Sequence, residues 1–334
     1  MVISCIMANY NTPKKYLDAS IRSILEQDYN DFELIIVDDA STDDSLKTLE
    51  EYQKKDHRIV ILRNEENIGL AASLNKAMAV SKGKYIIRMD TDDISLPSRF
   101  RKQLKFMEDN RDISVAGTFA KKIGDSDDYM VSPFCNAQYC KAQLLYAPCL
   151  IHPSVIIRKS FLDKNKLSYN EKYKCSQDFD LWTRCAEVGN ICIQSEVLLL
   201  YRVHNSQVST AKREMQKNYA KEIGLRQLKK LELCPTSDEI HMHLVLCRLE
   251  KYSQDMLFRM INWRDKIVSA NDNIGIYDKK SLRTMINDRA SNVVLTSDIS
   301  FQKKIHGIIR INGIYIFKYI CSVVRRLCLK HTSV

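Results

Sequence analysis

Residues 85–93 read YIIRMDTDD, a short apolar run that ends in three carboxylates within four residues. The run Tyr85–Met89 has the length and the bulky apolar side chains of a strand buried on both faces, as in a parallel sheet. Three neighbouring carboxylates repel one another, so the cluster Asp90–Asp93 needs either solvent, as in a turn or a helix cap, or a cation. Its place in the fold decides between these two interpretations.

Strands and helices alternate over the first 120 residues. Strand-like runs are predicted at residues 2–8, 32–37, 59–62, 85–89 and 114–120, and helix-like runs at 13–27, 43–56, 69–81 and 98–110. A looser region follows, with strands at 150–157 and 197–203 and a helix at 178–188. This alternation predicts an α/β fold, an open and mostly parallel sheet with helices on both faces. Ligands of such sheets bind beyond the carboxyl ends of the strands, where Asp90–Asp93 is expected.

Two further strands also end in polar residues. Asn9 and Asn11 follow the first strand, and Asp38 and Asp39 end the second. The next helix needs a cap, which the serine and threonine after Ala40 can supply, but it does not need two additional carboxylates. A carboxylate at this place can accept a hydrogen bond from the N3–H group of a pyrimidine base. We therefore expect a uridine or thymidine nucleotide at this edge.

The same edge has the chemistry of a divalent-cation site. A D-x-D arrangement such as Asp90-Thr91-Asp92 suits a hard ion that keeps several waters and bridges to phosphate oxygens. The chain contains neither G-x-G-x-x-G after the first strand nor G-x-x-x-x-G-K-[ST] anywhere, which excludes dinucleotide-binding and P-loop proteins. The charge of a diphosphate must then be met by metal and by basic side chains, for which Arg88 and Arg63 are the candidates.

Composition and charge narrow the class of protein. The 334 residues are 45% hydrophobic and 28% charged, which is ordinary for a folded protein. The net charge of +10 is concentrated near the C-terminus, because no acidic residue follows Asp298 whereas seven lysines and arginines do. Both signs mix over the N-terminal part, which argues against nucleic-acid binding. The eleven cysteines lack C-x-x-C spacing, and no secretion signal begins at Met1, so we expect reduced thiols in a cytoplasmic protein.

Four segments come in the order and spacing of the family 2 glycosyltransferases, which the chain resembles over about residues 1–210. They are residues 7–11 (MANYN), 32–43 (FELIIVDDASTD), 67–75 (NIGLAASLN) and 88–99 (RMDTDDISLPSR). The resemblance implies the nucleotide-diphospho-sugar transferase fold of GT-A type. It also implies an inverting transfer from a UDP- or dTDP-sugar to a hydroxyl of a glycan or lipid-linked acceptor, as in bacterial surface polysaccharide assembly.

The resemblance assigns roles to individual residues. Three are expected to line the nucleoside pocket: Ala8, Asn9 and Asp39. Three carboxylates are expected to form a site for Mg²⁺ or Mn²⁺: Asp90, Asp92 and Asp93. Asp39 is placed on the pyrimidine base, Asp92 on the ion against the diphosphate, and Asp90 near the ribose or the ion. The sequence departs from the family at Ala8, where Thr or Pro is common, and at Ser73, where some members have a phosphate-binding arginine.

An inverting transfer needs a base that deprotonates the acceptor hydroxyl. Residues 176–182 (SQDFDLW) resemble an acidic pair ahead of a Leu-Trp helix in the family, with Asp178 in the position of the base. Without the resemblance, a carboxylate there is explained by the helix dipole. Asp180 is the weaker candidate, because it is turned about 200° from Asp178 on a helix. His152 and His204 lie in segments that resemble those near the acceptor and the leaving diphosphate; a lone histidine is otherwise more often structural.

Beyond Thr210 only helices are predicted, and they form a helical extension over residues 211–298. His241 and His243 in this region have no acidic or cysteine partner at ligand spacing and are expected at the surface. The basic, partly apolar tail, residues 299–334, is too short and too charged for a membrane span. We expect it to lie on an anionic membrane surface; a helix packed on the protein or in a dimer is the alternative.

The sequence thus predicts a cytoplasmic hexosyl- or N-acetylhexosaminyltransferase, peripheral on the membrane. Two alternatives stay open. A sugar nucleotidyltransferase has a similar sheet, but it needs a Gly-rich loop with a basic residue, which Met7–Asn11 lacks. A degenerate nucleotide-sugar-binding membrane protein is disfavoured by the presence of Asp39, Asp92 and Asp178.

Overall fold

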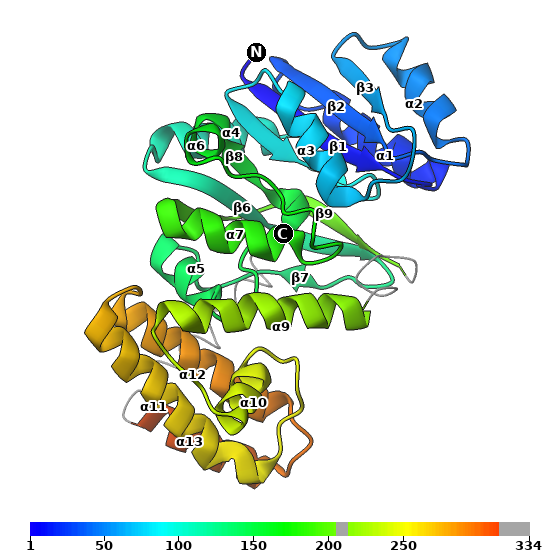
Figure 1. The fold of residues 1–334 in the computed structure, drawn as a ribbon. Helices are drawn as coiled ribbons and strands as arrows, with labels where there is room; N and C mark the ends of the chain where they lie inside the picture. The colour runs from blue at the N-terminus through cyan, green and yellow to red at the C-terminus, as the bar shows by residue number, and fades with distance from the viewer. Residues whose placement is uncertain (205–212, 314–334) are drawn as a thin grey trace. The chain divides into compact units, whose positions relative to one another are not determined.

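The structure is a computed structural model, and it describes residues 1–204 and 213–313. The chain forms two compact units (Figure 1). The first contains Met1–Cys135 and the segment that begins at Leu150; the second contains Asn136–Cys149 and the helices from residue 213 onward. The chain therefore contributes to the second unit before it completes the first. The predicted boundaries at residues 210 and 298 stay predictions.

The first unit is built on one mixed sheet with the order β3-β2-β1-β4-β8-β6-β9-β5, and β7 pairs with β6. The strands are β1 (Ile3–Asn9), β2 (Phe32–Asp38), β3 (Ile59–Arg63), β4 (Tyr85–Arg88), β5 (Ile94–Ser95), β6 (Ile113–Gly124), β7 (Tyr129–Met130), β8 (Ile156–Arg158) and β9 (Asn190–Val203). β1 to β4 are mutually parallel, as are β6 and β9, whereas β5, β7 and β8 are antiparallel to their neighbours. The predicted mostly parallel sheet is confirmed.

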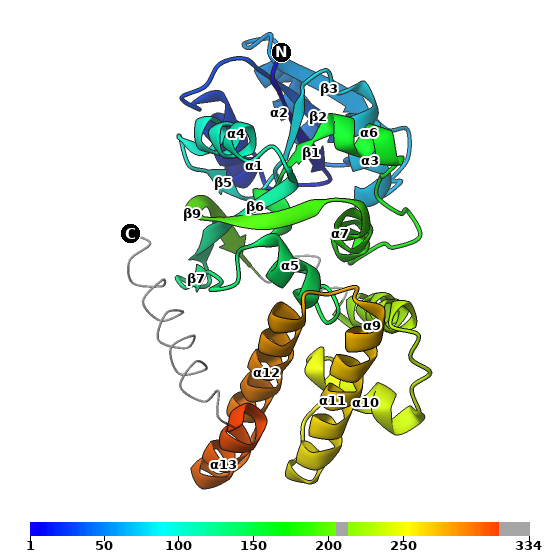
Figure 2. The same ribbon diagram turned by 90° about the vertical axis from the view of Figure 1, so that its left-hand side faces the viewer.

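Helices cover both faces of this sheet. They are α1 (Lys14–Leu25), α2 (Ser45–Gln53), α3 (Leu70–Val80), α4 (Arg99–Asp109), α6 (Lys159–Asn165) and α7 (Gln177–Val188). Apolar residues of α1 and α4 share one core with Ile3, Cys5 and Met7 of β1, which point to the same face because side chains alternate along a strand. α3 packs on β1 and β2 outside that core, and Figure 2 shows it on the opposite side of the strands from α1 and α4.

Parallel pairing brings the polar strand ends together. Asn9 is the register partner of Asp38, and Asp38 is the partner of Arg63 on the next strand. β4 also pairs parallel to β1, so Asp90, two residues beyond β4, lies at the same edge. The sheet therefore gathers at one edge the acidic residues that are far apart in sequence.

Two predicted strands of the looser region differ from the structure. Residues 152–154 form a short 3-10 turn, so the strand expected at 150–157 begins only at Ile156. Pro153 explains this, since it has no N–H group for a sheet. The strand expected at 197–203 is longer and begins at Asn190.

The second unit is helical, as predicted. Its helices are α5 (Ala137–Gln143), α9 (Arg213–Lys230), α10 (Ser237–Leu246), α11 (Leu257–Ile274), α12 (Lys279–Thr296) and α13 (Phe301–Asn312), with a 3-10 turn at Gln254–Met256. The surface position expected for His243 is wrong. Its side chain is fully buried, with its ring 5.2 Å from that of Tyr146 and 6.1 Å from that of Trp263. Burial lowers the pKa of His243 to about 3, so the residue is a neutral core histidine.

α13 is the described helix of the predicted basic tail, and residues 314–334 lie outside the described residues. Gly307 faces α12 so closely that a Cβ there would lie 2.9 Å from Val294 Cγ1. Ile305 and Ile309, one turn apart, are 43% and 48% exposed. Within the described ranges, no helix combines the length and the apolar character that crossing a membrane requires.

Candidate active site

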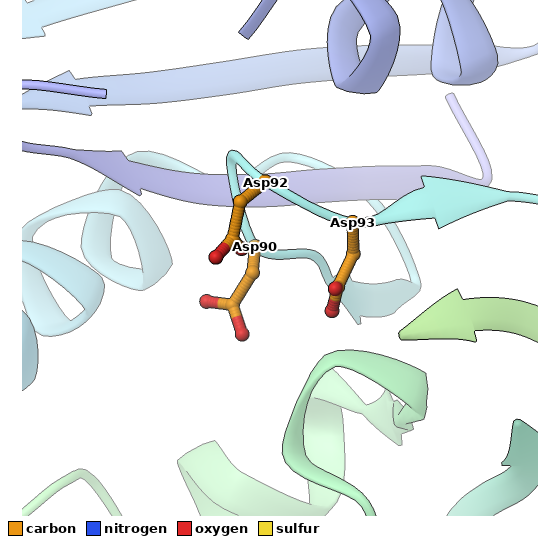
Figure 3. A group of neighbouring side chains, drawn as sticks. All are labelled: Asp90, Asp92 and Asp93. Atoms are coloured by element: carbon orange, nitrogen blue, oxygen red, sulfur yellow. The ribbon is translucent and has the colours of Figure 1, made fainter. Parts of the chain in front are cut away.

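The acidic cluster Asp90, Asp92 and Asp93 occupies the loop between β4 and β5. One carboxylate oxygen from each lies within 4.8 Å of the others, and Figure 3 shows the three side chains on the same side of the loop. Ser20 Oγ donates to the Asp90 carbonyl over 2.8 Å, and the hydroxyls of Thr12 and Thr91 are 2.8 Å apart. α1 and the chain before it therefore hold the backbone of this loop.

Arg88 pairs with the first carboxylate of the cluster. Its Nη1 donates to Asp90 Oδ2 over 2.6 Å, and its Nη2 donates to Asp90 Oδ1. Arg88 is 2% exposed, whereas the Asp90 side chain is 30% exposed. The guanidinium that the sequence assigns to a diphosphate is thus engaged by a neighbouring side chain.

The end of β9 holds the other two carboxylates. His204 Nε2 lies 2.9 Å from Asp92 Oδ2, and the His204 ring stacks on Tyr16 with 5.6 Å between centroids. The Arg202 N–H donates to Asp93 Oδ1 over 2.7 Å, and Arg202 Nε donates to the Asp92 carbonyl over 2.7 Å. The structure therefore brings His204 to the acidic cluster, more than a hundred residues away in sequence.

The electrostatics of the cluster fit a cation. Asp93 is 1% exposed, and its Oδ2 has no hydrogen-bond partner among the described residues. Burial, with the charges of Asp90 and Asp92, raises the pKa of Asp93 well above its usual range. Burial also raises the pKa of Asp90, against the opposing effect of Arg88. A buried carboxylate oxygen without a donor, in a group of three, is the donor set that a hard divalent ion such as Mg²⁺ or Mn²⁺ prefers.

Asp38 and Asn9 connect the first two strands. Asn9 Nδ2 donates to Asp38 Oδ1 over 2.8 Å and to Ser41 Oγ over 3.0 Å, and Ser41 donates to Asp38 through both its N–H and its hydroxyl. Asn9 and Asp38 are fully buried. Asn9 Oδ1 is also buried and has no protein partner in the described part of the chain. The polar ends of these strands thus mainly brace the turn that follows β2.

Asp39 fixes a different loop. Its carboxylate accepts from Asn64 Nδ2 over 2.8 Å, from the Ile68 N–H over 2.9 Å and from the Gly69 N–H over 2.8 Å. Gly69 has φ +89°, a left-handed conformation that glycine adopts without strain, and it begins α3. Asp39 is 4% exposed, so this carboxylate organises the 64–69 loop.

Two further residues, Ala8 and Arg63, are predicted to bind the sugar donor. Ala8 is half-buried on β1 beside Val37. Arg63 is exposed at the end of β3, and its carbonyl accepts from Lys76 Nζ over 2.9 Å. Arg63 is the register partner of Asp38, so it lies at the edge of the sheet where the acidic residues gather.

Asp178 lies in the first turn of α7 and is half-buried. Burial raises its pKa, while the Phe179 N–H group and Arg88 act in the opposite direction. The charge of Asp178 in turn contributes to the raised pKa of Asp90, after burial and the charge of Asp92. Asp180 differs, because it is fully buried and Arg184 donates to its Oδ2 over 2.9 Å.

His152 is held by aromatic residues. Its Nε2 lies 2.7 Å from the Tyr169 hydroxyl, and its ring makes edge contacts with those of Tyr169 and Trp182. Burial, together with Arg88, lowers the pKa of His152 well below its usual range. His152 is therefore a neutral group in the neighbourhood of Arg88.

Sequence reasoning missed three residues of this site. Arg202 binds the acidic loop, and its guanidinium lies 4.3 Å from the centre of the Tyr16 ring. The sequence did hold a signal for Arg202, which lies two residues before His204 at the end of β9. Residues two apart along an extended chain point to the same face. Tyr16 and Tyr169 carried no such signal, since one looks like a helix residue and the other lies in an irregular segment.

Comparison with known proteins identifies the family. The sequence pattern of Glycosyl transferase family 2 matches residues 4–166. An uncharacterized glycosyltransferase of Methanocaldococcus jannaschii is 39% identical over 225 residues, which cover 66% of this chain and 77% of that protein. This chain belongs to glycosyltransferase family 2.

Other relatives of this glycosyltransferase have more informative names. The O-antigen biosynthesis glycosyltransferase WbnJ of Escherichia coli is 37% identical over 61% of this chain and 80% of its own. The UDP-Glc:alpha-D-GlcNAc-diphosphoundecaprenol beta-1,3-glucosyltransferase WfaP of Escherichia coli is 30% identical over 67% of this chain and 88% of its own. Residues 1–349 of S. aureus TarS, solved with UDP-GlcNAc, superpose with a TM-score of 0.60 at 19% identity, covering 95% of this chain and 92% of that one. This superposition supports the GT-A type of fold.

Proposed function

We propose that this glycosyltransferase transfers a sugar, with inversion, from a UDP- or dTDP-sugar to a hydroxyl of a glycan or lipid-linked acceptor in surface polysaccharide assembly. The observation that carries the proposal is a group of three carboxylates with one buried oxygen that has no donor among the described residues, together with a separate, half-buried carboxylate at the start of α7 whose charge raises the pKa of Asp90. The names of two relatives support it, because WfaP uses UDP-Glc and a diphosphoundecaprenol-linked acceptor and WbnJ acts in O-antigen biosynthesis.

The donor binds at the carboxyl ends of β1 to β4 in this proposal. A carboxylate accepts about four hydrogen bonds, and the described residues supply three to Asp39, so we propose the remaining place for the N3–H of a pyrimidine base. The unsatisfied Oδ1 of Asn9 and the small side chain of Ala8 complete the nucleoside pocket. Arg63, exposed at the same edge, is placed to meet the diphosphate.

In this proposal Asp92 and Asp93 hold Mg²⁺ or Mn²⁺. His204 contacts Asp92, and Asp90, the third carboxylate of the cluster, is paired with Arg88. The ion neutralises the negative charge that develops on the leaving diphosphate. The protein's part is to fix these oxygens: the Arg202 N–H orients Asp93, and His204 orients Asp92. His204 and Arg202 also border the place where the diphosphate leaves.

Asp178 is the proposed base. Its raised pKa suits a group that must take a proton from an acceptor hydroxyl. The fold of α7 separates the two carboxylates of this turn, since Asp180 is buried and paired with Arg184. Neutral His152, held by Tyr169, lies in the same neighbourhood and is placed to bind the acceptor.

The C-terminal region is proposed to bring this enzyme to the cytoplasmic face of the membrane. The exposed Ile305 and Ile309 on α13 lie among Lys303, Lys304 and Arg310, and together they suit an anionic lipid surface. Flotation with vesicles tests this: binding should need anionic lipid and should be lost in an Ile305→Ser/Ile309→Ser variant. Equal binding to neutral vesicles would contradict it.

The activity is tested with purified protein, Mn²⁺, a panel of UDP- and dTDP-sugars and a diphospholipid-linked N-acetylglucosamine acceptor. We expect a product whose mass increases by one sugar and whose new linkage has the inverted anomeric configuration by NMR. Retention of configuration would contradict the mechanism. Binding of a nucleotide sugar without transfer to any acceptor or to water would instead indicate a degenerate binding protein.

A further inference from the structure

Arg88 is a buried cation at the end of an otherwise apolar strand. Tyr85, Ile86 and Ile87 precede it in β4, and Arg88 is 2% exposed. A guanidinium in such surroundings is costly unless it is paired and hydrogen-bonded. An apolar side chain would complete the strand without this cost, so the contacts of Arg88 point to its role.

Those contacts leave Arg88 little freedom. Its N–H donates to the Val155 carbonyl over 3.1 Å, and its own carbonyl accepts from Arg99 Nη2 over 3.0 Å. Both terminal nitrogens donate to the two carboxylate oxygens of Asp90, and Nε has no partner among the described residues. Because Arg88 is 2% exposed, a diphosphate could reach this guanidinium only if the groups that cover it moved.

The ion pair between Arg88 and Asp90 also reduces the negative charge that the cluster offers to a metal ion. Asp90 carries its own counter-ion on both oxygens, so an ion bound by Asp90 would share an oxygen with a guanidinium and be repelled by it. Asp93, in contrast, has one oxygen without a donor among the described residues, and Asp92 Oδ2 lies 2.9 Å from His204 Nε2. The cluster therefore presents two carboxylates to an ion rather than three.

We propose that Arg88 is a positioning residue that holds Asp90 out of the metal's coordination, so that the site binds a divalent cation weakly until a nucleotide diphosphate supplies further oxygen ligands. This inference rests on the metal site of the proposed function. It reassigns Arg88 from the diphosphate to Asp90, and it makes metal binding depend on the donor.

A double-mutant cycle tests this without any transfer reaction. Mn²⁺ alone is titrated into the full-length wild type, Arg88→Met, Asp90→Asn and the double variant, and free Mn²⁺ is measured by EPR. Removing the guanidinium frees Asp90, so Arg88→Met should bind Mn²⁺ about tenfold more tightly. Asp90→Asn leaves an unpaired cation and should bind more weakly. The double variant removes a neutral pair and should return to within about threefold of wild type.

Other outcomes have distinct meanings. If the double variant loses Mn²⁺ affinity as Asp90→Asn does, Asp90 is a metal ligand and the inference is wrong. This outcome can be read even if the single variant Arg88→Met does not fold. If Arg88→Met instead weakens UDP binding more than about tenfold in EDTA, Arg88 binds the diphosphate and the inference is equally wrong. If the folded wild type binds no Mn²⁺ with or without UDP, the proposed metal site itself fails.

A kinetic readout separates positioning from a structural role. Arg88→Lys keeps the charge but not the two-point contact, so Asp90 is held less firmly. We expect its kcat to fall by about tenfold while its melting temperature and its KM for the donor stay near wild type. A fall in melting temperature with an unchanged kcat would reduce Arg88 to a structural residue.

Discussion

Two acidic clusters lie at the same edge of the sheet, and they differ in how their oxygens are used. Asp38 and Asp39 are engaged by protein donors from Asn9, Ser41, Asn64 and the 68–69 backbone. In the cluster after β4, by contrast, a buried oxygen of Asp93 has no donor and burial raises the pKa of two carboxylates. The first cluster is therefore largely used to shape loops, whereas the second keeps a buried oxygen of Asp93 that we propose for a ligand.

The helix α7 repeats this division within one turn. Asp180 is fully buried and paired with Arg184, whereas Asp178 is half-buried with a raised pKa. What separates the two carboxylates is that Asp180 is fully buried with an arginine counter-ion on its Oδ2, whereas Asp178 is only half-buried. Substitutions on either side of this division should therefore affect different measurements, catalysis in one case and folding stability in the other.

The largest expected effect separates the two carboxylates of α7. Asp178→Asn should lower kcat by about a thousandfold, because the amide cannot accept the acceptor's proton. Asp180→Asn is the matched control and should lower the melting temperature while the folded enzyme keeps kcat within about threefold. Initial rates are measured with saturating donor. Loss of activity in Asp180→Asn but not in Asp178→Asn would contradict the assignment of Asp178 as the base.

A second substitution tests the cluster that shapes loops. Asp39→Asn removes the charged acceptor of three donors and should lower the free energy of unfolding by about 2–3 kcal/mol. Asp43→Asn, in an exposed turn where Asp43 Oδ1 accepts from the Ser45 N–H, should cost less than about 1 kcal/mol. Urea denaturation measures both. Equal costs would mean that the 64–69 loop does not depend on the charge of Asp39.

The pH dependence gives a smaller effect with a defined sign. The proposed base, Asp178, can accept a proton only when it is deprotonated, and burial raises its pKa above the ordinary 3.8. The rate should therefore be constant at higher pH and fall by about tenfold per unit below a midpoint that lies above 3.8. The profile is measured as kcat at saturating Mn²⁺, which keeps the cluster ionised. A profile that stays flat down to pH 3.8 would contradict the assignment of Asp178.

The sequence predicted the first strands and helices well because the apolar periodicity of the helices is strong and β1, β2 and β4 are buried on both faces. It also predicted that Asp92 and His204 belong to one site, but through a family resemblance rather than through spacing. It could not predict which carboxylates are satisfied, since the donors to Asp39 come from residues 64–69 and the partner of Asp93 from Arg202. The burial of His243 could not be predicted from helical periodicity. All five residues Met242–Leu246 are buried, so this part of α10 lacks the alternation of apolar and polar faces that marks a surface helix.

The central claim is that Asp90–Asp93 holds a metal ion against a nucleotide diphosphate. The most direct measurement is the melting temperature of wild type and Asp92→Asn with UDP, with Mn²⁺ and with both together. A ligand that binds only the folded protein raises the melting temperature. We expect UDP and Mn²⁺ together to raise the melting temperature of the wild type by more than the sum of their separate effects, and we expect Asp92→Asn to abolish this excess. An equal excess in Asp92→Asn, or no excess in wild type, would contradict the claim.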